Sequence, residues 1–456
     1  MSAGPERYVV LDLTHGGLFI SQELAELGHA VSAVDVYDTV DEQDLADLRQ
    51  RGIAASRDAV PLRETDVLVV PVHLDPAYTM LQKAHRMGIP VISHHRATGM
   101  VLIESGVIDG ATVIEITGSK AKTSTASILA DILSRTMSVV LHTSRGLEYW
   151  DKGDCRPIHT GLSIAPGSIL AAIHEVQDAH VRPSVYIFEV SLGGTGYADI
   201  GVITTLSPDY RIACDTGWAS DAKMQMIEHA KQGATLIINT EAEKAIHRAD
   251  QRGVKVIRFS DSPHHAADIN IRLDDHTLMI ETNNNNFTLT MRDGYDVASY
   301  TTAIAAAVGV ADHMGIKNDM IRTTLSGFGG LTGRGRQQDL DGRVLIDNSN
   351  SGMDIRSAER ALEQACVLCT SNNIRVCLVI GEDASQVCEG LPPTSVVDLL
   401  ERHIQDIDSL VLVGERMQGI KYDNTYYAGS LQEGLSMALE RTEPADLIIS
   451  CVKCFR

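Results

Sequence analysis

Cysteine, positive charge and long apolar runs are all scarce in this sequence. Eight cysteines in 456 residues are too few for a disulfide scaffold. Acidic residues outnumber basic ones by 60 to 39, a formal net charge of −21, which opposes binding to nucleic acid or an anionic membrane surface. No apolar run is long enough to span a bilayer. The polar segment before the first apolar run predicts no secretory leader, so we expect a cytoplasmic enzyme.

Two CxxC pairs, Cys366/Cys369 and Cys451/Cys454, stand out among the few cysteines. Together they could supply four zinc thiolates. The first pair lies within an apolar helical pattern, however, and buried structural thiols explain such a pair more simply than a metal does. The CxxC spacing alone is a weak pattern, so it leaves metal binding open.

The length predicts two or three domains. Short apolar runs alternate with helical patterns along the chain, which predicts α/β domains with parallel sheets, because parallel neighbours need crossover helices. The first block contains strand-like runs at 8–12, 67–72 and 89–92, with a tight turn at His15-Gly16-Gly17. It resembles a Rossmann-like domain. The dinucleotide fingerprint GxGxxG is absent there, which disfavours a dinucleotide oxidoreductase.

Two further blocks follow the first. We expect strands at 112–117, 185–190, 200–205, 235–239 and 254–259, a hairpin at 276–291 and an alanine-rich helix at 297–314. Five glycines within 327–335 predict a mobile connector, after which strands and helices alternate again from residue 344. The predicted domains are 1–108, 109–333 and 334–456.

The segment Gly118-Ser119-Lys120-Ala121-Lys122-Thr123-Ser124 follows a predicted strand and opens a predicted helix. Such a loop can bind phosphate through backbone N–H groups and a lysine, and the threonine hydroxyl can bind Mg²⁺. The standard GxxxxGK[ST] pattern is not met, because Ile116 and Ala121 stand where its glycines would be. By itself the loop could equally be a good helix start.

Two downstream residues strengthen the interpretation of this loop. Glu189 lies within a buried strand pattern, where an ionised carboxylate is costly unless it is paired or binds metal. A salt bridge to a neighbouring lysine is the structural alternative. Lys223 follows in a helical pattern, and alone it would be an ordinary surface lysine.

Taken together, the loop, Glu189 and Lys223 resemble the Mur ligase family, whose members use ATP to activate a carboxylate as an acyl phosphate. The family loop G-T-x-G-K-[ST]-[ST] matches residues 118–124, with Ala121 at its second glycine. The resemblance implies that Thr123 and Glu189 bind Mg²⁺, and that Lys223 is carbamylated and bridges a second metal. It also implies that Arg334 contacts ATP and that Asp347 contacts the ribose of the nucleotide. The implied architecture is a Rossmann-like N-terminal domain, a P-loop ATPase-like central domain and a Rossmann-like C-terminal domain.

Several positions depart from the family pattern. Tyr210, after Ser207-Pro208-Asp209, stands where a metal-binding histidine is usual, so the second metal site is lost or rebuilt around Asp209. Tyr300 replaces an adenine-contacting asparagine, and the C-terminal substrate-binding stretch is shortened to residues 448–454. An amino-acid-adding member would be expected to keep more of these features.

These departures resemble an archaeal branch of the family that closes a carbocyclic ring on a nickel tetrapyrrole in methanogens. The resemblance implies phosphorylation of a propionate side chain, followed by attack of a carbon of the same molecule on the acyl phosphate. His15, His94, His95 and Arg96 are candidate contacts to that substrate, and surface histidines are the alternative. Two other functions stay open: a Mur-type ligase that adds an amino acid, and a non-catalytic nucleotide-binding protein.

Overall fold

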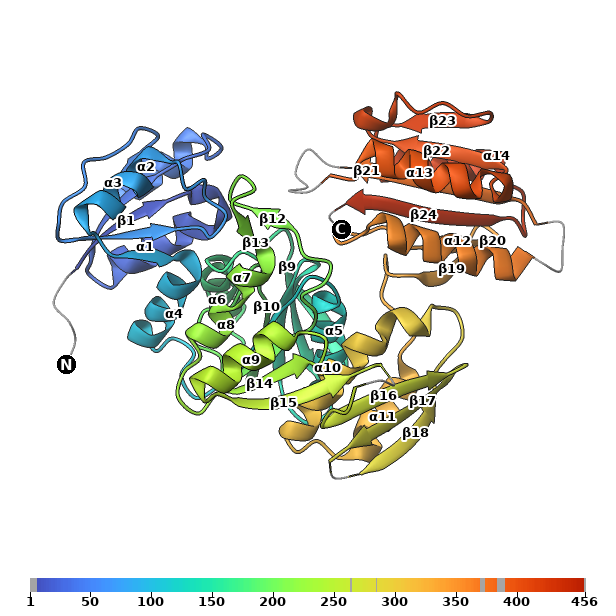
Figure 1. Ribbon diagram of the computed structural model, residues 1–456, viewed down its shortest axis with the longest axis horizontal. Coiled ribbons are helices and arrows are strands. Elements are labelled where there is room, and N and C mark those ends of the chain that lie inside the picture. The colour runs from blue at the N-terminus through green and yellow to red at the C-terminus, as the bar shows by residue number, and fades with distance from the viewer. Residues whose placement is uncertain (1–5, 263–264, 284, 370–373, 384–389, 455–456) are drawn as a thin grey trace. The chain divides into compact units, whose positions relative to one another are not determined.

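A computed structural model describes residues 6–262, 265–283, 285–369, 374–383 and 390–454. Strands within these ranges form three large sheets and one two-stranded pair (Figure 1). Each large sheet corresponds to one of the three α/β blocks that the sequence predicts. Of the helices in this part of the chain, none combines the length and apolarity needed to cross a membrane.

The first sheet is parallel throughout. Alternate residues of its central strand face opposite sides: Tyr8 and Val10 pack in one apolar cluster, and Val9 and Leu11 pack in another. In spatial order the strands are β3 (Ala54–Ser56), β2 (Ala30–Val34), β1 (Arg7–Leu11), β4 (Asp66–Val70) and β5 (Val91–Ser93). The helices are η1 (Leu13–Gly17), α1 (Leu18–Glu26), α2 (Glu42–Gln50), α3 (Thr79–Met87) and α4 (His94–Ser105).

The second sheet has eleven strands, with β6 in its interior between β11 and β10. In spatial order they are β18 (Asn286–Thr290), β17 (Thr277–Thr282), β16 (Ile269–Asp274), β15 (Lys255–Ser260), β14 (Thr235–Asn239), β11 (Ile200–Ile203), β6 (Thr112–Thr117), β10 (Val185–Glu189), β7 (Val139–Thr143), β8 (Gly146–Asp151) and β9 (Asp154–His159). The accompanying elements are α5 (Lys122–Ser134), α6 (Ser168–Asp178), the pair β12 (Arg211–Ile212) and β13 (Gly217–Trp218), α7 (Ala219–Lys223), α8 (Gln225–Glu228), α9 (Glu243–Arg252), η2 (Val297–Tyr300), α10 (Thr301–His313) and α11 (Asn318–Gly327).

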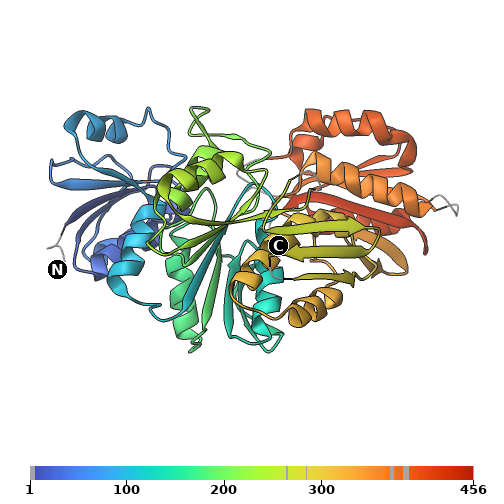
Figure 2. The ribbon, with the colours of Figure 1, turned by 60° about the horizontal axis from the view of Figure 1, so that its bottom comes forward.

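The third sheet has six strands and is coloured orange to red in Figures 1 and 2. In spatial order they are β19 (Arg336–Leu340), β20 (Arg343–Asp347), β24 (Leu447–Cys454), β21 (Val376–Asp383), β22 (Ser409–Val413) and β23 (Thr425–Ala428). Only β19 is antiparallel to its neighbour. The helices are α12 (Ile355–Cys369), α13 (Pro393–His403), η3 (Ile404–Asp406), η4 (Glu415–Met417) and α14 (Leu431–Arg441).

The chain folds into two compact units. The first comprises Met1–Arg272, Met279–Thr288 and Thr301–Thr324, and the second comprises Leu273–Leu278, Leu289–Tyr300 and Leu325–Arg456. The predicted boundaries at 108/109 and 333/334 stay predictions. The predicted connector at 327–335 belongs to the second unit.

Most of the predicted strands form within one or two residues of their expected bounds. The strands at 112–117 and 235–239 match in full. The helix expected over 297–314 is divided into η2 and α10. The antiparallel strands β8 and β9 were not predicted, because their mixed polar sequence lacks the apolar run that marks a buried parallel strand.

The C-terminal CxxC pair does not form a metal site. Cys451 packs in the apolar cluster on one face of the third sheet, and Cys454 packs in the cluster on the other face. Cys366 is half-buried, and the side chain of Cys369 lies outside what the structure describes. Both cysteines of the C-terminal pair are thus buried, and the interpretation of the first pair as buried structural thiols stays a prediction.

Among the histidines of the first unit that the structure describes, three are fully buried. His94 and His95 direct Nε2 at the backbone oxygens of Leu11 and Ser191, at 2.8 and 2.7 Å. His142 lies on β7 with its ring against Phe188. Burial lowers the pKa of each ring to about 4. The alternative of surface histidines at 94 and 95 is therefore wrong, because both rings pack inside the unit, and their contact with the substrate stays a prediction.

These buried rings predict that stability falls in mild acid. As pH falls through 6.5, the ordinary pKa, a histidine in the unfolded chain gains a proton, whereas buried His142 stays neutral until about pH 4. We expect each such ring to cost about 1 kcal/mol of unfolding free energy between about pH 7 and about pH 5.5. Denaturant unfolding of His142→Leu should show a shallower pH dependence than the wild type; an unchanged slope would contradict this assignment.

Candidate functional site

The loop after β6 and the end of β10 meet at one edge of the central sheet. Parallel pairing sets Glu189 beside Ile116, next to the start of the loop. Thr123 donates its hydroxyl hydrogen to Glu189 Oε2 at 2.8 Å, and the Ser144 backbone N–H donates to the same oxygen at 3.2 Å. Lys122 Nζ lies 3.9 Å from Glu189 Oε1. Three predicted residues, Lys122, Thr123 and Glu189, are thus brought together.

Glu189 and Thr123 are 2% and 4% exposed. A carboxylate this deeply buried needs partners for its charge, and the hydroxyl, the N–H group and the ammonium provide them. A carboxylate beside a threonine hydroxyl is also the oxygen donor set that Mg²⁺ prefers. These residues therefore fit the predicted metal.

The loop itself has the backbone of a phosphate-binding turn. Gly118 has φ +152°, and a Cβ built there would lie 2.0 Å from Thr204 Oγ1. Ser119 and Lys120 donate backbone N–H groups to Thr205, which anchors the loop. Helix α5 starts without a side-chain cap, and the buried Ser119 Oγ has no hydrogen-bond partner within the described structure. Uncapped N–H groups at a helix start are a binding site for anions.

Ala121 has a backbone conformation that favours glycine. Its φ is +66° and its ψ is −3°, in the left-handed region that favours glycine. The Thr125 N–H still bonds to the Ala121 carbonyl at 2.8 Å, closing the first helical turn. An alanine in this conformation therefore stores a modest strain in the loop.

Lys223 is 1% exposed and packs against Tyr210. Its Nζ lies 4.8 Å from the centre of the Tyr210 ring, a cation–π distance. Asp209 accepts a backbone hydrogen bond from Ser220 at 2.9 Å. Burial opposes ionisation of Asp209, but its hydrogen bonds with Ser220 and Tyr210 and the charge of Lys223 lower its pKa overall. Carbamylation of Lys223 stays a prediction, and it would bring negative charge toward the negative face of the ring.

Arg334 and Asp347 lie in the second unit. Asp347 is fully buried, and its carboxylate accepts N–H groups from Gly333 at 3.0 Å and Ser349 at 3.3 Å. Tyr300 donates its hydroxyl to the Arg334 carbonyl at 2.8 Å and accepts the Leu331 N–H at 2.9 Å. The segment around Arg334 is thus fixed to its own unit, and the contacts of both residues with ATP stay predictions.

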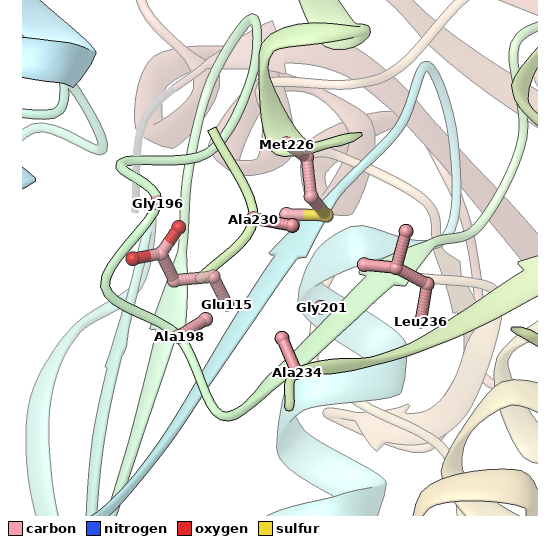
Figure 3. Close-up of a pocket in the computed structure, with 8 residues that line it drawn as sticks. All are labelled: Glu115, Gly196, Ala198, Gly201, Met226, Ala230, Ala234 and Leu236. Carbon is pink, nitrogen blue, oxygen red and sulfur yellow. The ribbon is translucent and has the colours of Figure 1, made fainter. Parts of the chain in front are cut away.

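A second buried carboxylate, Glu115 on β6, has a structural role that the sequence did not reveal. It accepts the Thr195 N–H at 2.7 Å as well as the Thr195 hydroxyl. Burial raises the pKa of Glu115 in spite of these bonds. It borders a cavity of about 10 Å³, room for about one water. Figure 3 shows Glu115 and Leu236 on opposite sides of this cavity, whose volume is too small for a substrate.

Comparison with known proteins agrees with this geometry. The model of the Mur ligase middle domain matches residues 116–307, and that of the coenzyme F430 synthetase CfbE C-terminal domain matches residues 337–454. The coenzyme F(430) synthetase of Methanosarcina acetivorans is 47% identical over 99% of both chains. The chain belongs to the coenzyme F(430) synthetase family. This confirms the predicted resemblance to Mur ligases and to their methanogen branch.

More distant relatives of this coenzyme F(430) synthetase family member include UDP-N-acetylmuramoylalanine–D-glutamate ligases. A UDP-N-acetylmuramoylalanine–D-glutamate ligase of Streptococcus mutans is 24% identical over 97% of this chain and 91% of its own. The MurF ligase of Thermotoga maritima, solved in complex with ADP, is 14% identical with a TM-score of 0.58, covering 93% of this chain and 92% of its own. These likenesses confirm the predicted three-domain α/β architecture of Mur ligases.

The strain at Ala121 can be measured. Ala121→Gly should raise the unfolding free energy by about 0.5–1 kcal/mol, because glycine adopts positive φ without steric cost. Ala130→Gly in the interior of α5 is the matched control and should lower the unfolding free energy by at least about 1 kcal/mol. Denaturant unfolding would measure both, and destabilisation by Ala121→Gly would contradict the left-handed assignment.

Proposed function

We propose that this protein uses ATP and Mg²⁺ to activate a propionate carboxylate of a nickel tetrapyrrole, seco-F(430) acid, as an acyl phosphate. ADP leaves in that phosphorylation, and a carbon of the same molecule then loses a proton and attacks the acyl carbon, so that the bond to phosphate breaks, phosphate leaves and a cyclic ketone forms. The observation that carries the proposal is the Lys122–Thr123–Glu189 group, in a chain 47% identical to a coenzyme F(430) synthetase.

Each residue of this group has a distinct proposed role. Lys122, whose side chain is 18% exposed, would neutralise phosphate oxygens, and the start of α5 would orient them through its N–H groups. Thr123 and Glu189 would hold Mg²⁺, whose chemistry is to screen the negative charge on phosphate oxygens during transfer. ATP supplies the phosphoryl group. Arg334 and Asp347 are proposed to contact ATP.

The alternative is an amide-forming ligase that adds an amino acid to a carboxylate. Lys223 bears on the choice, because its packing against Tyr210 departs from the metal-bridging role expected in amino-acid-adding members. Ring closure within one molecule needs no amine substrate. We therefore favour the cyclising reaction over amide formation.

Phosphate release tests the proposal. The purified protein with ATP, Mg²⁺ and the ring-open nickel tetrapyrrole should release phosphate and shift the visible spectrum without any amino acid. Glu189→Gln and Lys122→Ala should each slow turnover by at least about 100-fold, because each removes a charge that stabilises the transition state. Glu175→Gln, at a partly exposed carboxylate on α6, is the matched control and should retain wild-type rates.

Two results would overturn this function. Phosphate release that depends on an added amino acid would identify the amide-forming ligase. ATP binding without turnover on the tetrapyrrole, with Lys122→Ala changing only affinity, would identify a non-catalytic nucleotide-binding protein.

A further inference from the structure

A cluster of polar side chains lies at the carboxyl edge of the first sheet, outside the ATP group. Asp12 follows β1, Tyr37 follows β2 and His73 follows β4. The strand order β3-β2-β1-β4-β5 reverses direction between β1 and β4. Ligands bind open parallel sheets at such a reversal, because the connections there leave toward opposite sides and open a crevice.

Asp12 is the centre of the cluster. Its Oδ2 lies 2.7 Å from His15 Nδ1 and 3.5 Å from His73 Nε2, and its Oδ1 accepts the Thr14 and His15 N–H groups. The residue is fully buried and has φ +68°, an uncommon conformation for aspartate. Burial opposes its ionisation, but the hydrogen bonds from His15 and His73 hold the pKa of Asp12 well below its usual range.

Asp12, His15 and His73 can supply metal-ligand atoms that lie within 4.8 Å of one another. Among the residues that the structure describes, this is the one group of three or more histidine, cysteine or acidic residues with that geometry. A proton on His15 Nδ1, directed at Asp12, leaves the lone pair on Nε2. This carboxylate–imidazole pairing fixes the ring and raises its basicity in many metal sites. Imidazole is a suitable ligand for nickel. The His15 side chain is 36% exposed, so an external metal can approach it.

The neighbouring rings have the orientation that a bound macrocycle needs. A tetrapyrrole lies roughly perpendicular to the plane of an imidazole that binds its metal axially. The rings of His73 and Tyr37 stand at 80° and 89° to the ring of His15, and at 15° to each other. Tyr37 is 41% exposed. Both rings can therefore lie along the flat face of a macrocycle held by His15.

We propose that His15, oriented by Asp12, is the axial ligand to the nickel of the tetrapyrrole substrate, with His73 and Tyr37 packing along the macrocycle. This inference rests on the proposed function, because it takes the substrate from there. It assigns substrate recognition to the first sheet, separate from the phosphate chemistry at Lys122 and Glu189.

Binding without ATP tests this site in the full chain. The probes are the ring-open nickel tetrapyrrole and its metal-free counterpart, titrated while the visible spectrum is recorded. The nickel form should bind with a ligation-dependent spectral shift, and the metal-free form should bind at least about tenfold more weakly. His15→Ala should abolish the shift and weaken binding at least about tenfold, and Asp12→Asn should weaken binding by about tenfold, because the imidazole loses its orienting partner.

His85→Ala, at an exposed position on α3 of the same sheet, is the matched control and should bind as the wild type does. Affinity for an ATP analogue should be unchanged in all of these variants, which shows that they remain folded. A full spectral shift in His15→Ala, or equal affinity for the nickel and metal-free probes, would overturn the site. Binding of free Ni²⁺ alone, with no binding of either tetrapyrrole, would also overturn it.

The site and the proposed function fail separately. If the wild type turns over the tetrapyrrole and His15→Ala binds it as tightly as the wild type does, the proposed nickel site is wrong and the proposed reaction stands. If the nickel tetrapyrrole gives a spectral shift that depends on His15 but no phosphate is released, the proposed site stands and the proposed reaction is wrong.

Discussion

One buried carboxylate organises the candidate active site. Glu189 ends a strand in the middle of the central sheet, where an ionised group is costly to desolvate. The Thr123 hydroxyl, the Ser144 N–H and the Lys122 ammonium offset that cost, and they come from the segments that follow β6 and β7. The carboxylate therefore ties three separate chain segments to one point. Parallel pairing fixes Glu189 next to Ile116, and this places the carboxylate beside the start of the loop after β6.

Much of the central site could be predicted because its signals are local. The 118–124 loop lies between a strand and a helix that are both strongly patterned, and a lone glutamate in an apolar strand already signals a charge with a partner. The left-handed conformation of Ala121 could not be read from the residue, since alanine normally disfavours it. The three-dimensional environment of the loop overrides that local preference.

Contacts between residues far apart in the sequence could not be predicted from local patterns. The placement of Lys223 over Tyr210 depends on how α7 packs. The spacing of residues along the sequence does not predict that packing. The convergence of Asp12 with His73 depends on β1 and β4 being neighbours. His15 was identified as a substrate candidate, but His94 and His95 were grouped with it although their rings are buried. Sequence proximity to a strand end gives no information on which way a side chain points.

The second unit is assembled from three separate stretches of chain. Tyr295 and Tyr300, from the stretch at Leu289–Tyr300, pack edge to face with Phe328 beyond α11. A fragment that began at residue 334 would lack this aromatic cluster as well as Gly333, whose N–H group satisfies the buried Asp347 carboxylate. The six-stranded sheet expressed alone would thus lose one hydrogen bond to a buried carboxylate and leave an apolar surface incomplete, and autonomous folding would require residues that precede it in the chain.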